Sequence, residues 1–167
     1  RHTRFKCDWS SDVCSSDLPA EVGRARVFFV TEPLGESAAA ALAAGLAEGR
    51  TVVVAPKDAR IGPTVARLSG VPALEVTEAR PAQYAMLGEK DFRHPLFAAF
   101  ADARFSDFTR IHVWHYRRFV ASDIPGCRVL ARFDSGDPAV MEVPAGRGRL
   151  LVFAFGWQLD DSQWALS

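Results

Sequence analysis

The clearest pattern in this chain lies in residues 26–55, RVFFVTEPLGESAAAALAAGLAEGRTVVVA. Residues 26–31 and 51–55 are short, nearly continuous apolar runs, which are typical of strands buried on both faces, and we expect the first to be a central strand. The Ala- and Leu-rich residues 38–48 predict a helix that ends at Gly49. A strand, a helix and a second strand in this order predict a βαβ unit, whose strands pair in parallel through a right-handed crossover.

The remainder of the chain continues with helices and strands and then changes character. Short spacers rich in Gly, Asp and Arg, residues 134–138 and 145–148, separate three expected strands, and spacers of this length indicate antiparallel hairpins. The sequence therefore predicts an α/β fold in which a parallel N-terminal βαβ part is followed by antiparallel hairpins. The further elements that we expect are helices at residues 63–68 and 95–103 and strands at residues 73–77, 110–119, 128–133, 139–143 and 149–155.

The two ends of the chain differ from the rest. The first residues, RHTRFKCDWSSDVCSSDL, show no helix or strand period, and residues 8–18 within them resemble the conceptual translation of a sequencing adapter. We therefore expect residues 1–18 to be a disordered assembly artefact and the genuine domain to occupy residues 19–167. Residues 160–162 predict the start of a helix, so we also expect the domain to be truncated at its C-terminal end.

Charge and composition argue against several partners. The 20 Lys and Arg residues balance 20 Asp and Glu residues. The chain therefore lacks the excess of positive charge with which proteins bind nucleic acids and anionic membranes. Arg110, Arg117 and Arg118 lie among aromatic residues, a pattern that base stacking also uses, but the overall balance favours a solvated strand face. The longest small-apolar run, residues 38–47, is about half the length of a membrane span.

One segment lies where a serine hydrolase would hold its nucleophile. Residues 35–39, GESAA, fall between an expected strand and an expected helix, so Ser37 occupies the position of a nucleophile elbow. Glu36 and Ser37 are also residue types that cap a helix start, and we favour capping. A serine nucleophile needs a histidine and an acid, and no histidine follows His115.

A cysteine nucleophile has even less support. Cys7 and Cys14 lie in the expected artefact, so Cys127 is the one cysteine of the genuine domain and no intrachain disulfide is expected. Residues 125–129, PGCRV, open a strand rather than a sharp strand-to-helix turn, so we expect a buried structural thiol.

Other candidate motifs have simpler structural interpretations. His112 and His115 are three residues apart, a spacing that directs them to opposite faces of a strand, so we expect no metal site. We expect His94 to start a helix rather than to act as a base. Residues 146–149, GRGR, resemble part of a phosphate loop but lack the strand before and the helix after it, so we expect a tight hairpin turn.

Several blocks of sequence together resemble a known family. They resemble the segment that follows the von Willebrand factor A domain in large bacterial membrane proteins of the aerotolerance (Bat) type, and they span nearly all of residues 24–167. The resemblance implies a flavodoxin-like, class I glutamine amidotransferase-like layered sheet, located at the cell membrane on its extracytoplasmic side. The blocks are residues 85–89 (AMLGE), 94–100 (HPLFAAF), 105–111 (FSDFTRI), 131–139 (ARFDSGDPA), and 146–149 (GRGR) before 161–163 (DSQ).

The resemblance does not extend to catalysis. Amidotransferases of that class need a cysteine on an elbow and a late His-x-Glu motif, and neither occurs in this sequence. We therefore expect a non-catalytic structural or interaction module of a membrane-anchored bacterial envelope protein, without metal or cofactor. Its partners would be proteins or other domains of the same chain, with no nucleic acid, and it would meet the membrane only through segments absent from this sequence.

Two alternatives from other functional classes stay open. The first is a serine hydrolase or amidase that uses Ser37. The second is a small-ligand binding domain, with a crevice near residues 33–37 and 56–63 at the carboxyl ends of the parallel strands.

Overall fold

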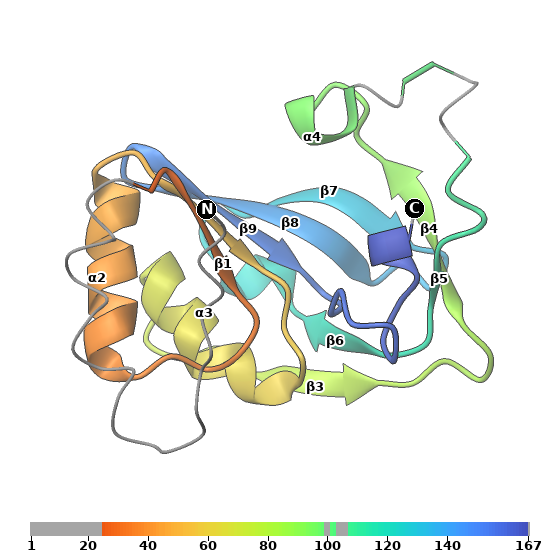
Figure 1. Cartoon of the computed structure of the whole chain (residues 1–167), viewed down its shortest axis with the longest axis horizontal. Helices are drawn as coiled ribbons and strands as arrows, with labels where there is room; N and C mark the ends of the chain where they lie inside the picture. Colours follow the sequence, from red (N-terminus) through yellow and green to blue (C-terminus); the bar gives the residue numbers. More distant parts are fainter. Residues whose placement is uncertain (1–24, 99–100, 103–106, 167) are drawn as a thin grey trace, which may run out of the picture.

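A mixed seven-stranded sheet forms the centre of the protein (Figure 1). The computed structural model describes residues 25–98, 101–102 and 107–166. From one edge of the sheet to the other, the strands are β1 (Val27–Val30), β2 (Thr51–Val54), β9 (Gly148–Phe153), β8 (Pro138–Ala145), β7 (Arg128–Phe133), β4 (Ala85–Lys90) and β5 (His112–Val113). The pairs β1–β2 and β2–β9 are parallel, and all the other neighbouring pairs are antiparallel.

Two helices pack together against one face of this sheet. The chain passes from β1 to β2 through α2 (Glu36–Ala47), which contacts α3 (Gly62–Ser69). Gly148 shows which face they cover, because a Cβ atom there would lie 2.5 Å from the carbonyl oxygen of Leu46 in α2. Side chains alternate between the faces of a strand, and those that share the face of Gly148 are completely buried at Val52, Val54, Leu150 and Val152.

The predicted mixed α/β architecture is confirmed. The βαβ unit is present, with β1 and β2 parallel from Val27 opposite Thr51 onwards. The two predicted hairpins, β7–β8 and β8–β9, are antiparallel. The GRGR motif forms the second hairpin turn, because Ala145 pairs with Gly148 and Gly146 adopts a φ of 61°, as the first central residue of a type II′ turn requires.

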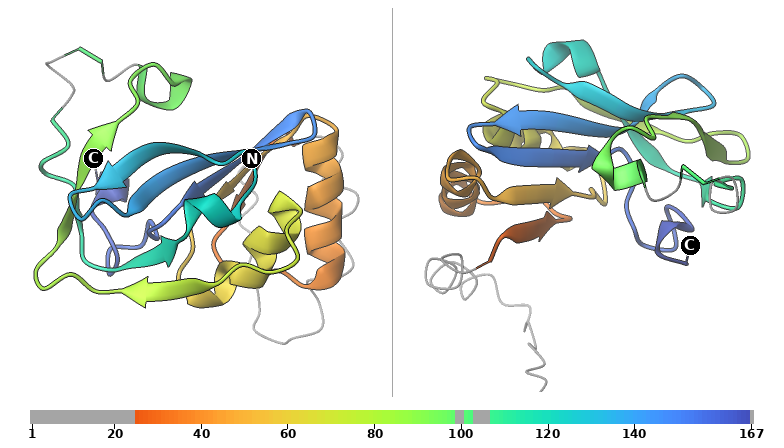
Figure 2. Two further views of the ribbon diagram at one scale, coloured as in Figure 1. Left: turned by 180° about the vertical axis from the view of Figure 1, so that it is seen from behind. Right: turned by 90° about the horizontal axis from the view of Figure 1, so that it is seen from above.

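The position of β1 corrects one expectation. β1 is an edge strand rather than a central strand, as Figure 2 shows, and the side chains of Val27 and Phe29 are 49% and 62% exposed. An apolar run alone does not distinguish the two positions. The third parallel strand, β9, comes from the far end of the chain and pairs with the side of β2 that faces away from β1.

The middle of the chain also differs from the prediction. Residues 110–119 form two strands, because β5 pairs with β4 whereas β6 (Tyr116–Phe119) pairs with β3 (Val76–Ala79) in a separate antiparallel sheet. β3 begins three residues after the start of the strand predicted at 73–77. No strand was predicted where β4 lies.

The predicted helices of the second half are replaced or shortened. The structure assigns α4 to Pro95–Ala98, and residues 99–100 and 103 of the predicted helix lie outside the described residues, as do residues 1–18. Residues 160–162 form a turn and an isolated bridge instead of a helix start. Short 3₁₀ helices complete the fold at η1 (Ala59–Ile61), η2 (Ala121–Asp123) and η3 (Trp164–Leu166).

Candidate functional site

A buried ion network lies where the parallel strands end. β1, β2 and β9 run in the same direction, so their carboxyl ends meet at one edge of the sheet, the edge at which open α/β folds bind ligands. Arg117 of β6 and Asp161 of the C-terminal segment meet there, and each residue is 3% exposed. We call these two residues, with Glu78 and His115, the Arg117 network.

Every N–H group of the Arg117 guanidinium has an acceptor. Nη1 donates to the carbonyl oxygen of Pro56 (3.0 Å) and to the carboxylate of Asp161. Nη2 donates to the carbonyl oxygen of Lys57 and also faces the Asp161 carboxylate. Nε lies 3.2 Å from Oε2 of Glu78. Because an arginine side chain has five N–H donors, these contacts leave none of them for a ligand.

Asp161 is held from several sides as well. Oδ2 accepts the backbone N–H of Gly156 (3.0 Å), and Oδ1 lies 3.6 Å from Nδ1 of His115. The carbonyl oxygen of Asp161 accepts the backbone N–H of Trp114 (2.8 Å). A Cβ atom at position 156 would overlap the side chain of Gln158 and would lie 2.6 Å from Oδ2 of Asp161, so a larger residue there would displace these side chains.

The Arg117 network is a structural cross-link. It joins the end of β2, the strands β3 and β6, and the C-terminal segment, which are far apart in the sequence (Figure 1). A buried charge pair is tolerated only when its geometry is good and the remaining donors and acceptors are satisfied. The network therefore lies just after the carboxyl end of β2. This is part of the edge where the sequence predicts the alternative ligand crevice, at residues 33–37 and 56–63.

Exposed ion pairs lie around the network. Nζ of Lys57 lies 2.5 Å from Oε1 of Glu32, so one pair links the segments that follow β1 and β2. Asp58 begins η1, and its Oδ1 accepts the backbone N–H of Arg60 (2.9 Å). The Arg60 side chain also donates to Asp58 and holds the pKa of that carboxyl below its ordinary value.

We expect the protein to lose stability in acid. The pKa of Asp58 is lowered mainly by the Arg60 side chain, and the pKa of Asp91 mainly by the backbone N–H of Arg93. A group with a lowered folded-state pKa contributes stability that is complete above about pH 4, the ordinary pKa of Asp, and is lost as the pH falls through its folded pKa. Urea unfolding measured between about pH 7 and pH 2.5 should show this decrease. The Asp58→Asn variant should show a shallower one, and an identical acid dependence would contradict the assignment.

Ser37 lies exposed in the first turn of α2. Gly35 is the N-cap of this helix and no side chain caps it, so the expectation that Glu36 and Ser37 cap the backbone is wrong. The negative charge of Glu36 still lies in the first turn, and it pairs with Arg67 at 3.2 Å. The loop before the helix is held by Thr64, whose Oγ1 accepts the N–H of Leu34 (2.9 Å).

The described histidines have partners away from Ser37. Nδ1 of His94 accepts the N–H of Leu96 (3.2 Å), which confirms that His94 starts a helix, and its Nε2 lies 3.3 Å from Glu142. The ring of His112 stacks on Tyr84, with 3.9 Å between the centroids, and His115 faces Asp161. Within residues 25–98, 101–102 and 107–166, no group of three or more His, Cys, Asp or Glu side chains is arranged to hold a metal ion.

Cys127 lies directly before β7, at the strand opening that the sequence predicted. Its backbone N–H donates to the carbonyl oxygen of Ile124 (3.1 Å), and its side chain is half-buried against the core. Burial raises the pKa of the Cys127 thiol, which lowers the fraction of the nucleophilic thiolate at neutral pH.

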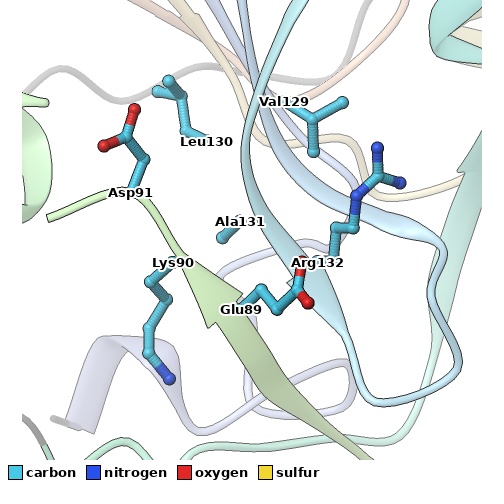
Figure 3. Close-up of a pocket in the computed structure, with 7 residues that line it drawn as sticks. All are labelled: Glu89, Lys90, Asp91, Val129, Leu130, Ala131 and Arg132. Carbon is cyan, nitrogen blue, oxygen red and sulfur yellow. The ribbon is translucent and has the colours of Figure 1, made fainter. Parts of the chain in front are cut away.

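A pocket of about 210 Å³ opens between β4 and β7, where their pairing is interrupted by a bulge (Figure 3). Both cationic side chains in its lining are already engaged. Nζ of Lys90 donates to the carbonyl oxygens of Leu87 (3.0 Å) and Gly88 (2.7 Å) and lies 4.8 Å from the centre of the Phe108 ring. Nη1 of Arg132 donates to the carbonyl oxygen of Gly136 (3.0 Å). Burial lowers the pKa of Lys90. In Figure 3 its ammonium group points away from Arg132 of β7, so the lining charges do not converge on one point.

The sequence did not identify the Arg117 network. The sequence predicts that Arg117 and its neighbours lie on a solvated strand face. This prediction is wrong for Arg117, which is buried, whereas the side chain of Arg118 is 51% exposed. Asp161 was assigned to a helix start. The partners of Arg117 lie 39 and 44 residues away, in Glu78 and Asp161, so no local motif connects them.

Comparisons with known proteins show similarity in fold. No family model matches the chain, and no curated protein matches it. The chain is similar to the cytoplasmic protein STM1381 from Salmonella typhimurium LT2, with 14% identity over 80% of this chain and a TM-score of 0.60. It is also similar to the cytoplasmic protein STM3548 from Salmonella typhimurium, with 13% identity over 81% and a TM-score of 0.60. It covers 62% of each of those chains.

A third structure is less similar. The exo-beta-1,4-mannosidase Op5Man5 from Opitutaceae bacterium strain TAV5 has 15% identity over 80% of this chain and 21% of its own, with a TM-score of 0.48.

The expected location must be corrected. The two structures with higher scores are described as cytoplasmic, which contradicts the extracytoplasmic location implied by the resemblance to Bat-type proteins. None of the helices in the described residues is both long and apolar enough to cross a membrane.

Proposed function

We propose that this domain is a non-catalytic structural or interaction module. The observation that carries the proposal is the Arg117 network, in which a buried cation and a buried anion satisfy each other at the edge where open α/β folds bind their ligands. A site that binds a substrate there would keep convergent polar groups free for it. Here those groups hold strands and the C-terminal segment together.

We further propose an amidotransferase-like, flavodoxin-type classification for the fold and a relationship to the von Willebrand factor A-associated aerotolerance family. The parallel strands β1, β2 and β9 with α2 and α3 on one face, extended by the hairpins β7–β8 and β8–β9, support the classification. The family relationship rests on the sequence blocks alone. The partners of this domain would then be other domains of the same polypeptide or separate proteins.

A labelling experiment tests the absence of catalysis. We expect a fluorophosphonate probe to label the folded full chain no more than the Ser37→Ala variant, because the described histidines are engaged by Glu142, Tyr84 and Asp161. Labelled peptide is measured by mass spectrometry, with a known serine hydrolase as positive control. Stoichiometric labelling that disappears in Ser37→Ala would support the serine hydrolase or amidase instead. Saturable thermal stabilisation by a metabolite, weakened by substitutions at residues 33–37, would support the ligand-binding alternative.

A further inference from the structure

The outer edge of β1 presents backbone groups that no strand of the described residues pairs with. The N–H of Thr51 donates to the carbonyl oxygen of Arg26, and the N–H of Ala55 to that of Val30, both at 2.9 Å. Even-numbered residues of β1 therefore bond toward β2, and the N–H and C=O groups of Val27 and Phe29 point to the opposite side. Within the part of the chain that the structure describes, no strand pairs with this side.

The side chains of this edge are unusual for a free edge strand. Natural edge strands carry charges, prolines or bulges that prevent pairing with another chain, whereas β1 has the sequence VFFV. Val27 and Phe29 are among the exposed large hydrophobic residues of the protein, on the face of the sheet opposite α2 and α3. The ring of Phe29 packs edge-on against Trp157, with 5.5 Å between the centroids, and the rest of it faces outward.

We propose that the outer edge of β1 binds the same edge of a second copy of this chain. An antiparallel pairing around a two-fold axis at Phe29 places Phe29 opposite Phe29 of the other copy, as a hydrogen-bonded pair. Beyond the ends of β1, the same register would bring Arg26 of one copy near Glu32 of the other, where the Glu32 carboxylate also pairs with Lys57 of its own chain. The edge is thus complementary to itself in backbone groups and apolar side chains, and the central sheet continues from one copy into the other.

The size of the edge predicts the strength of the association. β1 contributes four residues. A contact of this length buries less surface area than the roughly 800 Å² per partner of a stable interface. We therefore expect a weak and reversible dimer rather than an obligate one. This inference does not depend on the absence of catalysis proposed above, because it concerns a different edge of the sheet.

Sedimentation equilibrium of the full chain over a wide concentration range tests the proposal. We expect a monomer–dimer equilibrium that Phe29→Lys weakens by at least about tenfold, because two like charges would then face each other at the axis. Val120→Lys is the matched control: Val120 is 47% exposed, lies outside β1 and should leave the dissociation constant unchanged. A wild-type chain that is monomeric at every concentration would overturn the proposal, as would equal effects of the two lysine variants.

A cross-linking experiment tests the register and does not depend on the stability of the lysine variant. Directly opposed residues that form a hydrogen-bonded pair in antiparallel strands have Cα atoms about 5.5 Å apart, which a disulfide can bridge. With Cys7, Cys14 and Cys127 replaced by serine, Phe29→Cys should form a disulfide dimer under mild oxidation, and Val120→Cys should remain monomeric. Failure of Phe29→Cys to cross-link would overturn the two-fold pairing and would leave the edge of β1 to a strand from a different protein.

Discussion

Replacement of Arg117 by methionine is expected to lower the free energy of unfolding by about 3–5 kcal/mol. Methionine keeps much of the side-chain length but removes the charge, so the carboxylate of Asp161, in a residue only 3% exposed, loses its counter-ion. The carbonyl oxygens of Pro56 and Lys57 lose their donors in the same step, and unsatisfied buried groups carry their own penalty. Urea unfolding monitored by tryptophan fluorescence measures the change.

The neighbouring residue provides the control for this variant. Arg118 also pairs with an aspartate, at 3.0 Å from Asp137, but its side chain is 51% exposed. An exposed pair contributes about 0–1 kcal/mol, so Arg118→Met should have a small effect. If Arg117→Met were no more destabilising than Arg118→Met, the Arg117 network would not be the cross-link that the geometry indicates.

A double-mutant cycle separates the pair from its surroundings. Asp161→Asn removes the negative charge but retains an oxygen that accepts the N–H of Gly156. In combination with Arg117→Met, the two losses should sum to more than the loss in the double variant, by about 0.5–3 kcal/mol, because each single variant leaves one unpaired charge. Additive losses would mean that the two side chains stabilise the fold independently.

The network and the βαβ unit illustrate what the sequence could predict. The apolar runs and the Ala-rich helix of residues 26–55 are local signals, and they predicted β1, α2 and β2 within about two residues. The hairpins followed from short turn sequences, which are equally local. These elements were predictable because propensity, periodicity and turn chemistry agree within each segment.

Pairing between distant segments was not predictable in this way. A run such as VFFV fits a central strand and an edge strand equally well, and its place depends on whether β9 pairs with β1 or with β2. The division of residues 110–119 into β5 and β6 likewise depends on Asp161, whose carbonyl oxygen accepts the backbone N–H groups of Trp114 and His115. A single sequence contains no signal for such contacts.

The packing of α2 on the sheet leads to the second large effect, a loss of about 3 kcal/mol or more in Gly148→Ala. A methyl group at this position would overlap the carbonyl oxygen of Arg50 and would lie 2.5 Å from the carbonyl oxygen of Leu46. Both obstacles are backbone atoms, so no side-chain rotation relieves the overlap. The end of α2 and the start of β9 would have to separate, which would open the core beside Leu150.

Gly35→Ala is the matched control for this substitution. Gly35 has an ordinary φ of −66°, and a Cβ atom there would meet nothing within 4 Å. Alanine at position 35 should therefore change the free energy of unfolding by no more than about 1 kcal/mol, because the loss of an N-cap glycine and the restriction of the unfolded chain oppose each other. Urea unfolding of both variants gives the comparison. A Gly148→Ala protein as stable as Gly35→Ala would mean that α2 does not approach β9 this closely. The helix would then have to pack differently on the sheet that the βαβ unit and the β8–β9 hairpin share.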